Sequence, residues 1–207
     1  MTIVPFFANP VMEIQLDLDL KKLTEFAFEM KNKDKNGANH TNRGGWQSND
    51  ISEEKHEEFI KLKKEISQHL QTYHLEVFRG MKFKGNVVHS LNNMWVNNNE
   101  KHNYNEWHIH PGGTLSGTYY IKHDGSKESG NIIFKHPKGT YITICHWFEE
   151  LVENFNEVTS ENIECTPKPN MLLIFPSWLE HKVEPNLKND TRISLSFNAA
   201  PILEKKS

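Results

Sequence analysis

The stretch RISLSFN, residues 192–198, decides the fold class, because polar and apolar side chains alternate strictly along it. Successive side chains of a β-strand point to opposite faces of the sheet. Arg192, Ser194, Ser196 and Asn198 therefore share one face, and the apolar residues between them share the other. We expect the apolar face to pack in a core and the polar face to line a wet surface.

A second stretch, TLSGTYYI at residues 114–121, has the same alternation. Thr114, Ser116, Thr118 and Tyr120 share a face by the same period of two, opposite the apolar positions that include Tyr119. Two strands with polar faces indicate a barrel or jelly roll in which a ligand satisfies the polar groups. The alternative is an ordinary antiparallel sheet with one face in solvent.

The chain changes character near residue 86. Before it, residues 13–18 alternate like a half-buried strand, Asp19 can cap a helix over the next turns, and a second helix is expected from Asp50, with Glu53 completing a capping box. The second helix should bury one stripe of residues at helical spacing. That stripe contains Phe59, Leu62, Ile66, Leu70 and Tyr73.

After residue 86, short runs rich in Val, Thr, Tyr, Ile and Phe are separated by turn signals. The order of elements predicts a mainly β (α+β) fold, in which residues 1–80 supply a strand and supporting helices and residues 86–200 form the β core. A chain of 207 residues fits a single domain, 1–207.

The composition limits the class of partner. The formal net charge is −3, which excludes the broad basic surface that grips nucleic acid. We find no apolar run long enough to span a bilayer. Cys145 and Cys165 form no short-spaced zinc motif, and we interpret them as reduced thiols of a cytoplasmic protein. Exposed strand edges favour a homodimer.

Three histidines and an arginine carry the chemistry. His108 and His110 share a strand face, and His181 follows His110 after 71 positions, at the end of an apolar run and a bend. Arg192 lies 11 positions further on. Neutral imidazoles bind iron, copper, nickel or zinc, so we predict a metal site at His108, His110 and His181.

Five stretches, taken in order, resemble the superfamily of 2-oxoglutarate- and Fe(II)-dependent oxygenases, in a small branch. The resemblance covers about residues 86 to 200 and implies a double-stranded β-helix, a jelly-roll or cupin-like barrel. The stretches are NMWVN (93–97), WHIHP (107–111), LSGTYY (115–120), FPSWLEH (175–181) and RISLSFN (192–198).

The resemblance also implies roles for single residues. His108 and His181 would be iron ligands, and Arg192 would hold the far carboxylate of 2-oxoglutarate, with Ser194 adding a hydroxyl. Tyr120 would make a second contact to that carboxylate, because related prolyl hydroxylases use the second tyrosine of such a pair. Asn93, with Trp95, resembles an element that lines the co-substrate pocket of some relatives.

His110 departs from the superfamily pattern, in which two histidines and one carboxylate hold the iron. Three neutral imidazoles leave the site one charge unit more positive than the usual set. We favour His110 as the third ligand. Glu106, on the same strand face, is the alternative, either as a ligand or as an acceptor behind one.

The sequence therefore predicts a 2-oxoglutarate- and Fe(II)-dependent dioxygenase that uses O2 to hydroxylate a small molecule or a protein side chain. One alternative is a three-histidine cupin-type metalloenzyme that does not use 2-oxoglutarate, with Arg192 binding an acidic substrate. The other is a degenerate barrel that binds a ligand without metal.

Overall fold

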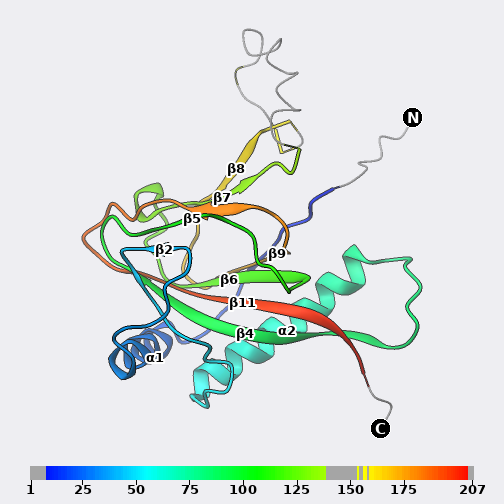
Figure 1. Cartoon of the computed structure of the whole chain (residues 1–207), viewed down its shortest axis with the longest axis horizontal. Helices are drawn as coiled ribbons and strands as arrows, with labels where there is room; N and C mark the ends of the chain where they lie inside the picture. Colours follow the sequence, from blue (N-terminus) through cyan, green and yellow to red (C-terminus); the bar gives the residue numbers. More distant parts are fainter. Residues whose placement is uncertain (1–7, 139–152, 154–155, 158, 205–207) are drawn as a thin grey trace.

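The computed structural model describes residues 8–138, 153, 156–157 and 159–204, and two antiparallel sheets form its centre (Figure 1). The larger sheet has six strands in the order β1-β9-β6-β11-β4-β3. The smaller sheet has five strands in the order β2-β5-β10-β7-β8. This is the double-stranded β-helix that the sequence predicted, and the mainly β fold class is confirmed.

The larger sheet contains the two strands that the alternation identified. β11 lies between β6 and β4 and pairs with both, with Ser194 opposite Tyr120 on one side and Asn97 on the other. The strands of this sheet are β1 (Met12–Gln15), β3 (Trp46–Gln47), β4 (Val87–Asn99), β6 (Leu115–Lys122), β9 (Met171–Pro176) and β11 (Arg192–Leu203).

The smaller sheet carries two of the three predicted metal ligands. In its register His181 of β10 lies opposite His108 of β5, which brings together residues far apart in the chain. A short 3-10 helix, η1 (Lys127–Ser129), precedes β7. The strands are β2 (Asn42–Arg43), β5 (Tyr104–His108), β7 (Ile132–Lys135), β8 (Asn162–Cys165) and β10 (His181–Val183).

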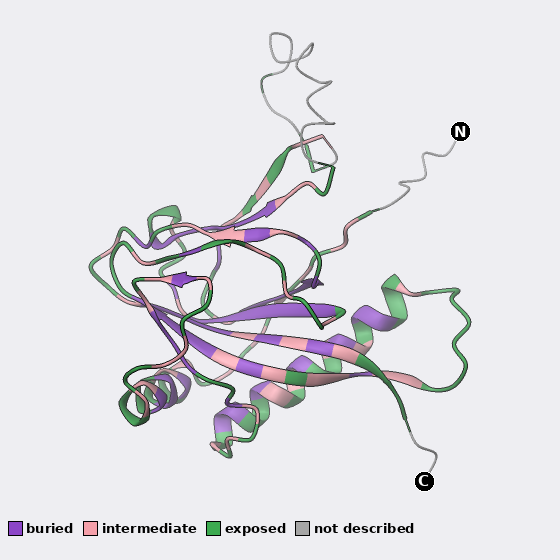
Figure 2. Ribbon diagram, in the orientation of Figure 1, coloured by how far each residue is buried: buried purple, intermediate pink, exposed green. Residues whose placement is uncertain are grey.

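Two helices, α1 (Leu20–Lys33) and α2 (Glu57–Val77), cover the outer face of the larger sheet (Figure 1). Their apolar stripes form one core with the apolar positions of β4, β6 and β11, and the predicted stripe of α2 is fully buried. The bands of alternating burial along β4 and β11 in Figure 2 follow from this arrangement. The opposite face of the sheet is free to line a cavity.

The predicted N-terminal cap is confirmed for α1, and the predicted start of α2 is wrong. Asp19 caps α1, since its Oδ1 accepts from the backbone N–H groups of Lys21 and Lys22. α2 begins at Glu57 rather than near Asp50, and Glu53 completes no capping box. Asp50 instead accepts from the backbone N–H groups of Ser52 and Met94, so its carboxylate fastens a turn to β4.

The predicted strand at residues 13–18 is shorter in the structure, where β1 ends at Gln15. Cys165 on β8 is a free thiol, and Cys145 lies outside the described residues.

Candidate active site

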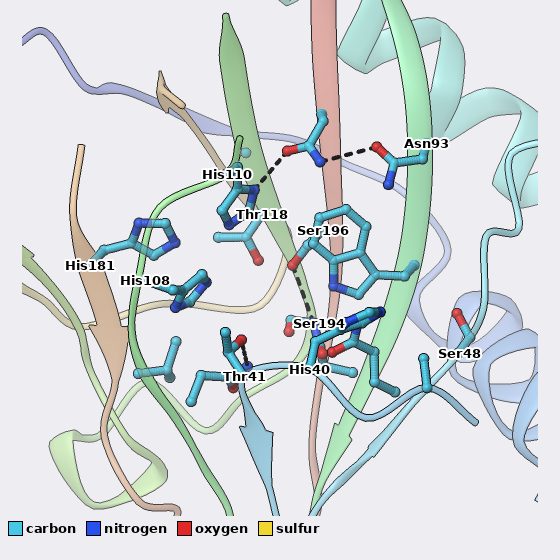
Figure 3. A pocket seen from close by; sticks show the side chains of 18 of the residues that line it. His40, Thr41, Ser48, Asn93, His108, His110, Thr118, His181, Ser194 and Ser196 are labelled. Carbon is cyan, nitrogen blue, oxygen red and sulfur yellow. Dashed lines mark hydrogen bonds between the residues drawn. The ribbon is translucent and has the colours of Figure 1, made fainter. Parts of the chain in front are cut away.

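A cavity of about 560 Å³ lies between the two sheets. Its floor is the polar face of the larger sheet, and the histidine-bearing strands of the smaller sheet close it from the other side (Figure 3). All three predicted metal ligands and Arg192 line this cavity, together with Tyr120, Ser194 and Asn93. The structure thus brings every site residue predicted from sequence into one space.

The rings of His108, His110 and His181 form a compact cluster. The ring centroids of His108 and His181 are 4.3 Å apart, and the other two pairs are each 5.1 Å apart. One nitrogen of each ring lies within 4.8 Å of those of the other two, a spacing that can hold a metal ion. His181, at 3% exposure, is the most deeply buried of them.

Each of these imidazoles has an oxygen acceptor at Nδ1. The acceptor is the backbone carbonyl of Glu106 for His108 at 2.6 Å, and that of Leu179 for His181 at 2.8 Å. For His110 it is the side-chain oxygen of Asn198, at 2.6 Å. A carbonyl oxygen accepts only, so Nδ1 carries the proton and Nε2 keeps its lone pair in all three rings. This is how metal-bound histidines are oriented in proteins.

Asn198 follows the regular alternation of β11, where it lies opposite Asn93 of β4 and Ser116 of β6 on the face that lines the cavity. Its Oδ1 also accepts from Ser116 Oγ at 2.8 Å, and its Nδ2 donates to Asn93 Oδ1 at 3.0 Å (Figure 3). The amide orientation is therefore fixed, with the oxygen toward His110.

Burial keeps the cluster neutral. It lowers the pKa of His110 from 6.5 to about 4, helped by the neighbouring His108 and opposed by the bond to Asn198. The pKa of His181 lies well below its ordinary value for the same reason, and burial lowers the pKa of His108 as well. A metal ion at neutral pH would meet three deprotonated Nε2 atoms and displace no proton.

Arg192 supplies the fixed positive charge of the cavity. Its Nη1 donates to the backbone carbonyls of Ser129 at 2.8 Å and Glu184 at 3.0 Å, while Nη2 is buried without a hydrogen-bond partner among the described residues. Burial lowers its pKa to about 10, so the guanidinium remains charged at neutral pH. A buried, half-satisfied cation is costly unless an anion completes its bonds.

Gly130 makes room for this guanidinium. Its φ of +92° lies in the left-handed region, and a Cβ built there would collide with Arg192 Nη1 and with the carbonyl oxygen of Glu184. Glycine alone fits both requirements. Gly130 was not among the site residues predicted from sequence, although a glycine directly before a predicted strand is a detectable signal.

The remaining predicted co-substrate residues lie around Arg192. Tyr120 is 2% exposed and interacts electrostatically with Arg192, whereas Tyr119 points into the core and donates its hydroxyl to Asn170. Ser194 lines the cavity directly opposite Tyr120 in the pairing of β11 with β6. Asn93 lines it too, with Oδ1 bound to Asn198.

Glu106 is turned away from the cluster. Its carboxylate pairs with Arg43 at 2.6 Å on the surface, and its contribution to the site is the backbone carbonyl behind His108. His40, which was not among the site residues predicted from sequence, also lines the cavity. His40 belongs to the segment before β2, for which the sequence offered no strand or motif.

Comparisons with solved structures place this fold among oxygenases. A Pseudomonas putida prolyl-4-hydroxylase is similar over 93% of each chain, with 14% identity and a TM-score of 0.60. A viral collagen prolyl hydroxylase from Paramecium bursaria Chlorella virus-1, solved with 2-oxoglutarate, matches over 92% of this chain and 96% of its own, at 13% identity and a TM-score of 0.58.

A Trichoplax adhaerens prolyl hydroxylase, in complex with a peptide fragment of the hypoxia inducible factor oxygen degradation domain, covers 93% of this chain and 84% of its own. Its identity is 15% and its TM-score is 0.61. At such identities the likeness establishes the double-stranded β-helix. A comparison with curated protein sequences finds no match.

The family model described as "Putative 2OG-Fe(II) oxygenase" matches residues 93–198, slightly more than half of the chain. The protein belongs to this family. It is therefore an oxidoreductase whose cofactors are Fe(II) and 2-oxoglutarate, with O2 as the oxidant. The unpartnered Nη2 of Arg192 and the three aligned imidazoles fit both groups. Within the described residues, no helix is long and apolar enough to cross a membrane.

Proposed function

We propose that His108, His110 and His181 hold Fe(II) through their Nε2 atoms and that Arg192 holds the far carboxylate of 2-oxoglutarate. The reaction converts 2-oxoglutarate, O2 and a substrate C–H bond into succinate, CO2 and an alcohol. One oxygen atom enters the succinate and the other enters the new hydroxyl. The observation that carries the proposal concerns Nη2 of Arg192, which is buried in the wall of the cavity that the three rings share and has no hydrogen-bond partner among the described residues.

His110 is our third ligand in place of Glu106. His110 donates its Nδ1–H to an oxygen, as His108 and His181 do, so its Nε2 lone pair is equally free to bind a metal. The carboxylate of Glu106 instead forms an ion pair with Arg43. An all-imidazole set adds no negative charge, so a dianionic co-substrate balances the two positive charges of the metal. Arg192 then compensates for burial of the distal carboxylate.

The remaining residues position the co-substrate and protect the reaction. Tyr120 and Ser194 can each direct a hydroxyl toward the carboxylate held by Arg192, and Asn93 supports Asn198 behind His110. Bound iron supplies the activation of oxygen. Ile132, Phe175 and Val183 form an apolar side of the cavity that excludes water from this end.

The substrate is a small molecule or a protein side chain. Support for hydroxylation comes from neighbours named prolyl hydroxylases, one of them bound to a peptide.

We also propose that residues 1–207 form one domain, because both helices share a core with the larger sheet. We propose a cytoplasmic location, in agreement with the free thiol of Cys165. We propose that the protein does not bind nucleic acid, in agreement with the net charge of −3. We also propose that it forms a homodimer. Light scattering and a nucleic-acid binding assay test these last points.

The decisive experiment titrates 2-oxoglutarate into the Fe(II)-loaded protein without oxygen, then admits oxygen and measures succinate. Arg192→Met should weaken 2-oxoglutarate binding by at least about 30-fold, because truncating one partner of a buried charge pair costs about 2–5 kcal/mol. Metal affinity should persist. Arg79→Met, which removes an exposed arginine, is the matched control. Equal 2-oxoglutarate affinity in wild type and Arg192→Met, or no binding at all, would overturn the proposal.

A further inference from the structure

The cavity has a second end that the proposed iron and co-substrate leave free. Its volume of about 560 Å³ is in the range of sites for drug-sized ligands, and 2-oxoglutarate is a much smaller diacid. Toward β3 and β4 the lining changes from apolar to amide and hydroxyl side chains. We name this region the amide-rich end, and it comprises His40, Thr41, Gln47, Ser48, Asn93, Trp95 and Asn97.

The register of the larger sheet connects the two ends. In one row across the sheet Tyr120 lies beside Ser194, Ser194 beside Asn97, and Asn97 beside Gln47. The co-substrate residues Tyr120 and Ser194 thus continue directly into two carboxamides. A substrate over Asn97 and Gln47 would lie next to the co-substrate and within the same cavity.

The side-chain oxygen of Asn97 accepts no hydrogen bond from the described residues. The side chain is 4% exposed, its Nδ2 donates to Ser196 Oγ at 3.2 Å, and its buried Oδ1 has no partner in the described part of the chain. Asn97 nevertheless lines the cavity. Buried polar atoms of native proteins are nearly always hydrogen-bonded, so this oxygen indicates a ligand that carries an N–H or O–H group.

The amide-rich end itself contains no Asp, Glu, Lys or Arg side chain. Among the described residues that line the cavity, only Arg192 and Asp50 carry formal charge at neutral pH, histidines aside. Arg192 belongs to the co-substrate end, and both oxygens of Asp50 accept hydrogen bonds from Ser52. An anionic substrate group placed here would lose its hydration without gaining a counter-ion, and a cationic one would meet only a carboxylate whose oxygens already accept hydrogen bonds.

Trp95 connects the amide-rich end with the metal ligands. Its ring centroid is 5.6 Å from that of His110, and Trp95 lines the cavity opposite Ser196 in the pairing of β4 with β11. An indole face offers a flat apolar surface for the C–H groups of a substrate. A molecule anchored at Asn97 would therefore have its carbon skeleton against Trp95, beside the iron.

From this geometry we propose that the primary substrate presents an uncharged, donor-bearing group to Asn97, either a carboxamide or a hydroxyl of a polyol. The inference rests on the proposed function and narrows its substrate to a neutral polar class. A carboxamide would come from an Asn or Gln side chain, and hydroxyls from a sugar.

The test uses isosteric pairs that differ in charge. N-acetylasparagine methylamide is compared with N-acetylaspartate methylamide, and glucose with glucuronate, by ligand-observed NMR on the protein loaded with metal and 2-oxoglutarate without oxygen. We expect the neutral member of at least one pair to bind at least ten-fold more tightly than its charged partner. The inference is overturned if the charged members bind equally well or if neither neutral probe binds.

Two variants provide the control. Asn97→Leu should weaken the preferred neutral probe about ten-fold, because a buried donor of the ligand then has no acceptor. Asn98→Leu removes the adjacent carboxamide, which is 1% exposed and not among the residues lining the cavity, and should leave probe affinity unchanged. Equal loss in both variants would contradict the inference. Should Asn97→Leu fail to fold, Asn97→Asp should still reverse any preference for neutral over cationic probes, tested with acetamide and acetamidine.

Metal and 2-oxoglutarate titrations of the wild-type protein separate the two proposals. If both bind and the neutral probes do not, the substrate inference fails alone. If 2-oxoglutarate does not bind, the proposed function fails first.

Discussion

Two histidine clusters occur in the part of the chain that the structure describes, and only one of them is built for a metal. In the cavity, His108, His110 and His181 each donate Nδ1–H to a fixed oxygen. Against α2, His74 and His89 pack at a ring-centroid distance of 5.1 Å, and neither Nδ1 has a partner among the described residues. Closeness of imidazoles alone therefore does not define a metal site.

The two clusters also differ in their surroundings. His74 and His89 pack on Phe78, and His74 also contacts Phe83, so their rings serve as aromatic packing on the helix side of the sheet. The cavity cluster faces open volume and a row of polar side chains. Oriented lone pairs and space for an ion distinguish the functional cluster from the structural one.

Removing one ligand should give the largest effect and test this distinction directly. His181→Ala is expected to weaken Fe(II) or Mn(II) binding by more than about 100-fold, since loss of an outer hydrogen-bond partner alone costs about 10–100-fold. Calorimetric titration and succinate formation measure it. His89→Ala, the counterpart in the other cluster, should retain metal affinity. A similar loss in both variants would mean that the clusters do not differ as described.

The orientation of His110 can be tested without touching a ligand. Asn198→Leu removes the acceptor at Nδ1 and should weaken metal binding about 10- to 100-fold, because Nδ1 and Nε2 are then no longer distinguished. Asn198→Asp should restore the affinity, since a carboxylate accepts the same proton. Co(II) absorption spectra report the ligand geometry. Unchanged spectra and affinity in Asn198→Leu would assign Asn198 to sheet stability alone.

The cluster of His74 and His89 should make the stability of the protein depend on pH. Burial, with His74 nearby, lowers the pKa of His89 from 6.5 to about 4. Between these values the unfolded chain binds a proton that the folded chain does not, so the free energy of unfolding falls as the pH falls. From pH 7 to pH 5 the loss attributable to His89 should be about 2 kcal/mol.

Urea unfolding of wild type and His89→Leu at the two pH values measures this difference. The variant should lose less stability on acidification. Parallel losses in the two proteins would show that His89 is not the group responsible.

The fold and the location of the site followed from local pattern. Alternation in 192–198 identified the wet face, and the same period separated Tyr120 from Tyr119, because strand geometry fixes which residues share a face. The start of α2 was wrong because Asp50 bonds to Met94 of β4, a distant partner that no helix rule contains.

Other features of the site depend on long-range pairing. The register that places His181 opposite His108 joins strands separated by most of the β core, and the acceptor for Nδ1 of His110 belongs to Asn198, 88 positions further along the chain. The carbonyls that hold Arg192 belong to Ser129 and Glu184, and backbone acceptors exist at every residue, so the sequence does not mark them.

The smallest expected effect concerns the backbone around the guanidinium of Arg192, which lies apart from both histidine clusters. Gly130→Ala places a methyl group against Arg192 Nη1 and should displace the guanidinium, weakening 2-oxoglutarate binding about ten-fold, or about 1.4 kcal/mol. Metal affinity should remain, because the histidines are held by other acceptors. Gly125→Ala is the matched control, since its φ of +79° imposes a similar backbone cost and no heavy atom of the described chain lies within 4 Å of its Cβ.

Comparing the two alanine variants separates strain from collision. Both should lose about 1 kcal/mol of stability, the usual cost of a left-handed non-glycine residue. Gly130→Ala should lose more than Gly125→Ala, because its Cβ also meets the backbone carbonyl of Glu184. Only Gly130→Ala should lose affinity for 2-oxoglutarate in an anaerobic titration. If both variants bind 2-oxoglutarate as the wild type does, the position of Nη1 is not what sets the co-substrate affinity, and the carboxylate must be held elsewhere in the cavity.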